Sequence, residues 1–375
     1  MGEARRTCPT CGEAYGSDAL FCPRDGAPLA ARKPDALGDP YLGLHLGSDL
    51  HLQRLVGIGS MGRVYRASQS SIGRPVAVKI LHREHMKRRD LVARFLREGR
   101  VAGGLSHPNL ITVHGSGELT PSPGETSAEP YIVMEFLDGM TLRSALAATE
   151  GVLPPSRALG IVLSISDAVG EAHARDIVHR DLKPENVMLV RVGADPDFVK
   201  VLDFGVARVG EADSSIATHA GAILGTALYA CPESARGERV GAPGDVYSLA
   251  TLLFECLAGK PPFVGAGPVD VLIQHAQAAP PDVRSLGAGR DVPAPLARFI
   301  EKNLAKNPND RAPDARTFGQ GLAEAARASG FDGAALTRRA TLLGGATTRA
   351  DAPAGGALTS SVTRKTLRDL GTRDA

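Results

Sequence analysis

The sequence contains no tryptophan, and aromatic residues make up only 4% of its 375 residues. Proteins that bind single-stranded nucleic acid commonly stack bases on aromatic side chains, and this chain has few of them. Lysine and arginine total 43 against 41 aspartate and glutamate residues, so the chain also lacks the basic excess of nucleic-acid and membrane-surface binders. We therefore expect no nucleic-acid partner.

Long apolar stretches are missing as well. No part of the sequence approaches the ~18 consecutive apolar residues that a membrane-spanning helix needs, so we expect no membrane span. The first ten residues, MGEARRTCPT, lack the apolar stretch of a secretory signal, and Arg6 stands where a myristoylation signal requires Ser or Thr. From these absences we expect a cytoplasmic location.

Cysteine is scarce, and its placement is uneven. Cys8, Cys11 and Cys22 cluster near the N-terminus, whereas Cys231 and Cys256 stand alone in the interior of the chain. This pattern predicts a metal site and reduced thiols rather than a disulfide framework. We expect Cys231 and Cys256 to be small buried residues, with a redox-sensitive thiol at Cys231 as the alternative.

The composition divides the chain into four parts. The first is rich in Cys, Gly and Pro and too short for an ordinary core, the second is linker-like, and the third has a globular texture. The fourth is rich in Ala, Gly and Thr without apolar periodicity, and we expect it to be disordered. The expected boundaries are 1–30, 31–47, 48–325 and 326–375.

The globular part changes character along its length. Short Val- and Ile-rich runs separated by turn signals come first and are typical of antiparallel strands, with one helical segment at 89–105 among them. After Thr141 the sequence is mostly helical. We therefore expect an α+β fold with a β-rich lobe over 48–138, a helical lobe over 139–325, and a cleft between them.

A glycine-rich segment, Gly57-Ile-Gly59-Ser-Met-Gly62-Arg-Val64, lies between two expected strands. Glycines allow backbone N–H groups to approach phosphate oxygens. A dinucleotide-binding fingerprint would need a helix directly afterwards, and a strand follows instead. Taken alone, the segment is equally compatible with a flexible hairpin that binds nothing.

Charged residues interrupt two of the apolar runs. Lys79 ends the buried-looking strand Val76-Ala-Val-Lys79, where it needs a partner, and Glu98 on the following helix is suitable. Taken singly, each would most simply be a solvated charge. The segment IVHRDLKPENVML (177–189) places Asp181 five residues before Asn186, and Asp203 follows another strand pair. These side chains can converge on one metal ion and an incoming hydroxyl.

These segments together resemble a bacterial, eukaryotic-like (Hanks-type) serine/threonine protein kinase. The similarity covers about residues 48–320, with the motifs in family order. It implies a two-lobed protein kinase fold that transfers the γ-phosphate of ATP, with Mg²⁺ or Mn²⁺, to Ser or Thr hydroxyls of protein substrates. Further matches are Gly225-Thr226, Pro232-Glu233, Asp245 and Arg311.

The resemblance implies where the nucleotide binds. The glycine-rich loop would cover the phosphates, and Lys79, oriented by its ion pair with Glu98, would hold the α- and β-phosphates. Met134 falls at the gatekeeper position, and the backbone of 135–137 would contact the adenine. The residues expected at the nucleotide are Gly57, Ile58, Gly59, Gly62, Val64, Ala77, Lys79, Met134, Glu135 and Leu137.

The resemblance also implies the catalytic roles. Asp181 would accept the proton of the substrate hydroxyl, Lys183 would contact the γ-phosphate, and Asn186 and Asp203 would hold Mg²⁺. The expected catalytic residues are Asp181, Lys183, Lys79 and Glu98.

The region expected to bind the peptide departs from the family pattern. Glu233 would pair with Arg311 to anchor this region, and Asp245 would support the catalytic loop. Ala227 stands where the family has Pro, and Cys231 where it has Ala or Ser, which leaves the peptide preference open.

Hydroxyl residues suggest regulation. The expected activation loop, 203–233, contains Ser214, Ser215, Thr218 and Thr226, and a phosphate there could pair with Arg180. We expect autophosphorylation at the first three of these residues or in the Thr-rich tail, and we expect it to take place within a transient dimer. A tail that is merely low in complexity is the alternative.

Two other functions remain open at this point. A pseudokinase-type signalling scaffold usually lacks the lysine, the catalytic aspartate or the metal-binding aspartate, and all three are present here. A small-molecule phosphotransferase of related fold is less compatible with the Gly-Thr and Pro-Glu elements and Arg311.

The N-terminal segment has the spacing C-x₂-C-x₁₀-C-x₂-D and resembles the two knuckles of a zinc ribbon. Cys8, Cys11, Cys22 and Asp25 would complete a tetrahedral Zn²⁺ site. A degenerate ribbon or three free thiols are the alternatives. We expect kinase activity to persist in a chain that begins near Leu46, because Lys79, Asp181 and Asp203 lie outside this segment.

Overall fold

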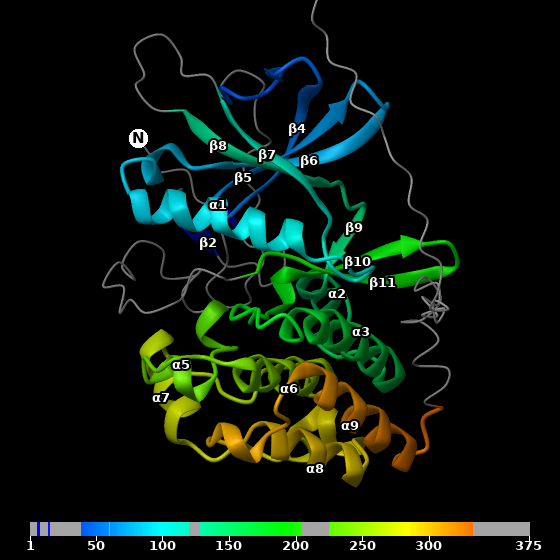
Figure 1. Ribbon diagram of the computed structural model, residues 1–375. Coiled ribbons are helices and arrows are strands. Elements are labelled where there is room, and N and C mark those ends of the chain that lie inside the picture. The colour runs from blue at the N-terminus through cyan, green and yellow to red at the C-terminus, as the bar shows by residue number, and fades with distance from the viewer. Residues whose placement is uncertain are drawn as a thin grey trace, which may run out of the picture.

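The computed structural model describes residues 39–59, 61–119, 128–204 and 225–332, together with the backbone of two short strands, β1 (Arg6–Thr7) and β2 (Ala14–Tyr15). The globular part has a β-rich N-lobe and a helical C-lobe (Figure 1), as expected from the sequence. Within the described ranges, no helix is both long and apolar enough to cross a membrane.

The N-lobe is built on a curled sheet of six antiparallel strands in the order β3-β4-β5-β6-β8-β7, and helix α1 (Arg89–Gly104) packs against it (Figure 1). The apolar runs recognised in the sequence form these strands. Their bounds are β3 (His45–Leu46), β4 (Leu50–Ile58), β5 (Gly62–Gln69), β6 (Arg74–Leu81), β7 (Val113–Leu119) and β8 (Glu129–Glu135).

Strand β6 is buried on both faces, which explains why its sequence is a continuous apolar run. Side chains alternate between the faces of a strand. Val76, Val78 and Ile80 belong to a core cluster on one face of the sheet, whereas Ala77 and Leu81 belong to a second cluster beside α1. The alternation places Lys79 on the α1 side, next to the cleft.

The C-lobe surrounds helix α6, which is mostly apolar and is buried from Gly244 to Ala258. A small antiparallel sheet in the order β11-β10-β9 lies at the top of this lobe, below the N-lobe (Figure 1). Its strands are β9 (Gly139–Thr141), β10 (Val187–Val192) and β11 (Asp195–Val201). The helices are α2 (Leu142–Ala147), α3 (Pro155–His173), α5 (Pro232–Ala235), α6 (Ala242–Ala258), α7 (Pro268–Gln277), α8 (Ala294–Asn303) and α9 (Ala315–Ala328).

Residues 39–46, which we call the strap, are packed on the N-lobe although the sequence analysis placed them in a linker. Tyr41 is only 5% exposed and belongs to the sheet's core cluster. Asp39 accepts hydrogen bonds from the hydroxyl of Tyr65 at 2.9 and 3.0 Å. Within the described residues, packing against the N-lobe therefore extends at least as far as Asp39. At the other end, α9 runs past residue 325, and Phe331 packs against the C-lobe core.

The two interior cysteines are buried. Cys231 is 4% exposed and Cys256 is fully buried in α6, as expected of small core residues. Burial raises the pKa of the Cys231 thiol to about 12. Because the thiolate is the reactive form, this burial disfavours a redox role for Cys231.

The strap leads to a first prediction. A chain shortened to begin at Leu46 loses Tyr41 and leaves the Tyr65 hydroxyl without Asp39, so its free energy of unfolding should fall by roughly 3 kcal/mol. A chain that begins at Gly38 keeps both contacts and serves as the control. Urea unfolding measures the difference, and equal midpoints for the two chains would contradict the packing role of the strap.

A second prediction concerns His275, which lies on α7 and is fully buried against α6. The Tyr247 hydroxyl donates to its Nδ1 at 2.9 Å, and its Nε2–H donates to the carbonyl of Leu228 at 3.1 Å. Burial, and then the charge of Lys306, lower the pKa of His275 from 6.5 to about 3. The folded state therefore keeps His275 neutral where the unfolded chain takes up a proton.

The contribution of neutral His275 to the free energy of unfolding is thus fully present above pH 6.5, and it is lost as the pH falls toward 3. By linkage, this loss amounts to about 2 kcal/mol between pH 7.5 and pH 5. His275→Gln keeps a donor and an acceptor but does not titrate. Between pH 7.5 and pH 5, the free energy of unfolding of the variant should therefore fall by about 2 kcal/mol less than that of the wild type. Urea unfolding at the two pH values tests this, and parallel losses in both proteins would refute it.

Candidate active site

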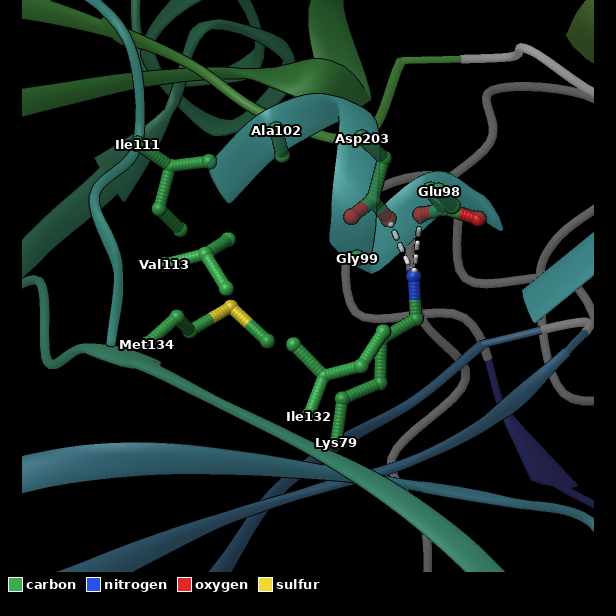
Figure 2. A pocket seen from close by; sticks show the side chains of 9 residues that line it. All are labelled: Lys79, Glu98, Gly99, Ala102, Ile111, Val113, Ile132, Met134 and Asp203. Carbon is green, nitrogen blue, oxygen red and sulfur yellow. Dashed lines mark hydrogen bonds and ion pairs between the residues drawn. The ribbon is translucent and has the colours of Figure 1, made fainter. Parts of the chain in front are cut away.

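The centre of the cleft holds an ion-pair junction. The ammonium of Lys79, on β6, lies 3.0 Å from Oε1 of Glu98, on α1, and 2.8 Å from Oδ2 of Asp203, which follows β11. Figure 2 shows Lys79 extending toward both carboxylates beside an apolar wall that includes Ile132 and Met134. Three elements that are distant in the sequence therefore meet at one ammonium group.

The charges at this junction are maintained by one another. Burial alone would lower the pKa of Lys79, but the carboxylates of Asp203 and Glu98 raise it above its usual value. Burial opposes ionisation of Asp203, yet the Lys79 ammonium holds the pKa of Asp203 below its usual range. Burial raises the pKa of Glu98 more than Lys79 lowers it. At neutral pH the cleft therefore presents a fixed cation beside a fixed Asp203 anion.

The loop before β10 brings the second group of candidates together. Oδ2 of Asp181 accepts from Lys183 Nζ at 2.8 Å and from Asn186 Nδ2 at 3.0 Å. Lys183 also donates to the hydroxyl of Thr226 at 3.1 Å, which joins this loop to the C-terminal part of the expected activation loop. Asp181 thus lies beside a cation and an amide.

A buried carboxylate on α6 supports this loop. Asp245 is 1% exposed and accepts from the backbone N–H groups of His179, at 2.7 Å, and Arg180, at 2.8 Å. His173 Nε2 donates to it at 2.8 Å. Arg180 has a φ of 65°, a costly conformation for a residue with a side chain, so the bonds to Asp245 hold a strained turn in place.

The turn that carries Asp203 is bound to the same loop. Its φ of 33° is also unfavourable for a non-glycine residue. The imidazole of His179 is fully buried, its pKa is lowered by burial, and it donates to the carbonyl of Leu202 at 2.9 Å. The same ring packs against Phe204 with 4.7 Å between ring centroids. His179 thus fixes Asp203 relative to Asp181.

The glycine-rich segment forms the turn between two strands. Gly57 and Ile58 end β4, and Gly62 begins β5. The N–H of Gly59 donates to the carbonyl of Gly62 at 2.8 Å. A Cβ at Gly62 would lie 2.2 Å from the carbonyl oxygen of Ile80, so this position requires glycine.

The expected adenine-contacting residues line the rear of the cleft. Ala77 on β6 pairs with Met134 on β8, and both are 7% exposed. Val64 on β5 lies opposite Lys79. Leu137 follows β8 and packs with the cluster that contains Met134. The expected nucleotide residues are therefore gathered on four neighbouring strands, β4, β5, β6 and β8, and the segments that adjoin them.

Glu135 makes a contact that the sequence did not indicate. Its Oε1 accepts from Lys200 Nζ, on β11 in the C-lobe, at 2.6 Å and from the N–H of Thr112 at 2.7 Å. The N–H of Ile111 donates to the carbonyl of Val201 at 3.0 Å nearby. These bonds tie the two lobes together directly behind the expected adenine site.

At the expected peptide end, Arg311 forms a buried, bidentate ion pair with Glu233, with both N–O distances 2.9 Å. Sequence reasoning paired these two residues but missed Arg143 on α2. Arg143 donates to Glu185 at 2.9 Å and to Glu255 at 2.8 Å, and it also contacts the Tyr229 hydroxyl. A single arginine in an ordinary helix offers no signal for such a role.

Several expected residues lie outside the described part of the chain. These are Cys8, Cys11, Cys22 and Asp25 of the N-terminal segment, and Ser214, Ser215 and Thr218 of the expected activation loop.

Comparisons with known proteins agree with the geometry. The protein kinase domain model matches residues 50–320. Serine/threonine-protein kinase PknB of Mycobacterium leprae is 41% identical over 269 residues, which cover 71% of this chain and 41% of PknB. Serine/threonine-protein kinase Pkn1 of Myxococcus xanthus is 38% identical over 325 residues, covering 84% of this chain and 45% of Pkn1.

Solved structures show the same fold. The crystal structure of the Mycobacterium tuberculosis PknI kinase domain superposes with a TM-score of 0.58 at 27% identity and covers 76% of this chain and 99% of that domain. The chain spans less than half the length of the two curated relatives. The protein kinase domain model matches most of the chain, and the contact between Lys79 and Glu98 agrees with that match. The chain therefore belongs to the protein kinase family.

Proposed function

We propose that the protein is a serine/threonine protein kinase that transfers the γ-phosphate of ATP to Ser or Thr hydroxyls of protein substrates. The observation that carries this proposal is the junction of Lys79 with Glu98 and Asp203 across the cleft from the Asp181 loop. Phosphoryl transfer needs positioning and charge stabilisation more than covalent chemistry, and these residues supply both.

The glycine-rich turn would cover the ATP phosphates, and Lys79 would hold the α- and β-phosphates. Asn186 and Asp203 have oxygen-bearing side chains and would hold Mg²⁺ or Mn²⁺. In phosphate-transfer sites such a metal ion has few protein ligands, and phosphate oxygens and waters are its other ligands. When bound, the metal would neutralise part of the negative charge of the phosphates. The lowered pKa of Asp203 fits this role, because the carboxylate is anionic at neutral pH.

Asp181 would take the proton of the substrate hydroxyl. Its Oδ2 is oriented by Lys183 and Asn186, so a hydroxyl must approach the other oxygen or displace one of these donors. Lys183 lies between Asp181 and Thr226 and would offset the charge of the γ-phosphate as it moves. Asp181 and Lys183 would thus act from the same loop, which Asp245 supports.

A pseudokinase-type scaffold is the alternative, and it is not favoured. Lys79, Asp181 and Asp203 are all present and in contact with suitable partners. The curated relatives are named as serine/threonine-protein kinases. Autophosphorylation through a transient dimer, at Ser214, Ser215 or Thr218, stays a prediction because these residues lie outside the described ranges.

We also retain the proposal that Cys8, Cys11, Cys22 and Asp25 bind structural Zn²⁺. Its support is the ligand spacing, together with the antiparallel pairing of β1 with β2, which flank the sequence segment that contains Cys8 and Cys11. The ligands themselves lie outside the described residues.

Replacing the proposed base tests the function. Asp181→Asn removes the proton acceptor while nearly keeping the shape of the side chain, so kcat should fall by roughly 10²–10⁴-fold. ATP affinity should stay close to that of the wild type. Transfer of labelled phosphate from ATP to a generic protein substrate measures the change.

The matched control is Asp176→Asn, the same substitution at an exposed turn residue with a φ of 58°, which Asn tolerates. The control should transfer phosphate at the wild-type rate. Wild-type transfer by Asp181→Asn would remove Asp181 from the mechanism, and an inactive wild type that binds ATP would favour the scaffold.

Metal analysis tests the zinc proposal. Gently purified protein should contain about one zinc per chain, and the metal should leave with a chelator or as the pH falls, because thiolates must be deprotonated to bind. Asp25→Cys should strengthen the binding and Asp25→Ala should weaken it. Protein free of zinc, or an Asp25→Ala variant with unchanged zinc affinity, would contradict the proposed ligand set.

A further inference from the structure

The strap contacts the segment that joins the two halves of the Lys79–Glu98 ion pair. Residues 82–88 connect β6, which carries Lys79, to α1, which carries Glu98, and we call them the β6–α1 connection. Arg83 in this connection donates from Nε to Oε1 of Glu129 at 2.7 Å and to the Tyr41 hydroxyl at 3.1 Å. The distance from the Arg83 guanidinium carbon to the centre of the Tyr41 ring is 5.5 Å.

Tyr41 and Glu129 complete a closed set of contacts, which we call the clamp (Tyr41, Arg83 and Glu129). The Tyr41 hydroxyl donates to Glu129 Oε2. The side chain of Glu129 is only 8% exposed, so its charge depends on these two donors for compensation. The clamp therefore ties three elements that are far apart in the sequence: the strap, β8 and the β6–α1 connection.

The same connection also holds the glycine-rich turn. The backbone N–H of His82 donates to the carbonyl of Met61 at 3.0 Å. The His82 imidazole donates from Nε2 to the carbonyl of Gly59 at 2.7 Å. Because His82 and Arg83 are adjacent, a shift of the clamp moves the anchor of the turn that would cover the ATP phosphates.

Helix α1 is poorly fixed by its own sequence. Its N-cap residue, Arg88, makes no side-chain capping bond, and no basic residue complements its last turn. Gly99 follows Glu98 directly and Gly103 and Gly104 end the helix, and a glycine within a helix weakens it relative to Ala by about 1 kcal/mol. The position of Glu98 therefore depends on the contacts that α1 and its entry segment make with the rest of the N-lobe.

We propose that the clamp is a positioning device for ATP, in which Tyr41, Arg83 and Glu129 hold the β6–α1 connection so that His82 anchors the glycine-rich turn and Glu98 meets Lys79. The inference rests on the proposed kinase function. None of the three residues touches the reacting atoms.

The test compares two tyrosine variants in the full chain. Tyr41→Phe removes both hydrogen bonds of the hydroxyl, to Glu129 and from Arg83, and keeps the ring beneath Arg83. Tyr65→Phe is the matched control, since it removes the hydroxyl contact of Tyr65 with Asp39 of the strap and leaves Tyr41, Arg83 and Glu129 unchanged. ATP affinity by calorimetry, KM for ATP, kcat and the urea midpoint are measured for each.

Tyr41→Phe should raise the Kd and KM for ATP by roughly three- to tenfold, the range that one or two hydrogen bonds control, with a much smaller effect on kcat. Tyr65→Phe should lower the urea midpoint by a similar amount and leave both ATP constants unchanged. Equal effects of the two variants on ATP would mean that the strap acts only through stability, and the proposal would fail.

A double-mutant cycle tests the route through His82. His82→Ala should weaken ATP binding, and Tyr41→Phe added to it should have less effect than Tyr41→Phe alone, because both act on one anchor. Independent, multiplicative effects would overturn this route. If the wild type binds ATP but transfers no phosphate, the proposed function is rejected, and the calorimetric comparison still decides whether the clamp positions ATP.

Discussion

The carboxylate of Asp245 is the interaction on which the active-site geometry depends. It comes from α6, the central helix of the C-lobe, and it compensates two backbone N–H groups at a strained turn. A turn of this conformation is costly without outside support, and Asp245 is buried so deeply that water cannot replace it. The most rigid part of the molecule thereby determines where Asp181 lies.

From that turn, the support passes upward to the other lobe. His179 binds the Leu202 carbonyl, Asp203 follows directly, and Asp203 meets Lys79 on β6. Lys79 in turn meets Glu98 on α1. The chain of contacts is continuous from the core of the helical lobe to the helix of the N-lobe, so the site is assembled only when both lobes are in place.

Much of this arrangement follows from patterns that can be seen in the sequence. The period-two and helical patterns identified the strands, and the ordered motifs identified Lys79, Glu98, Asp181 and Asp203 because each motif has a fixed place in this fold. The strap was missed because DPYLGLH has the glycine and proline content of a linker, while its anchor, Tyr41, reveals itself only through a partner 88 residues away. Local composition carries no information on such a contact.

Arg143 was missed for a related reason. On a helical pattern an arginine is most simply a solvated charge, and only the folded chain shows that it meets Glu185 and Glu255. Its partners come from the catalytic loop and α6, which approach each other through topology rather than through any periodicity. Pairs of this kind are invisible until the elements that carry them are placed.

The bond between Glu135 and Lys200 has a mechanical consequence. It lies on the side of the cleft where the chain passes from one lobe to the other, and the nearby backbone bond between Ile111 and Val201 reinforces it. Two bodies tied at one edge can separate only by rotation about that edge. Rotation of the lobes about that edge would break the contact between Lys79 and Asp203 and would move the glycine-rich turn farther than Glu135.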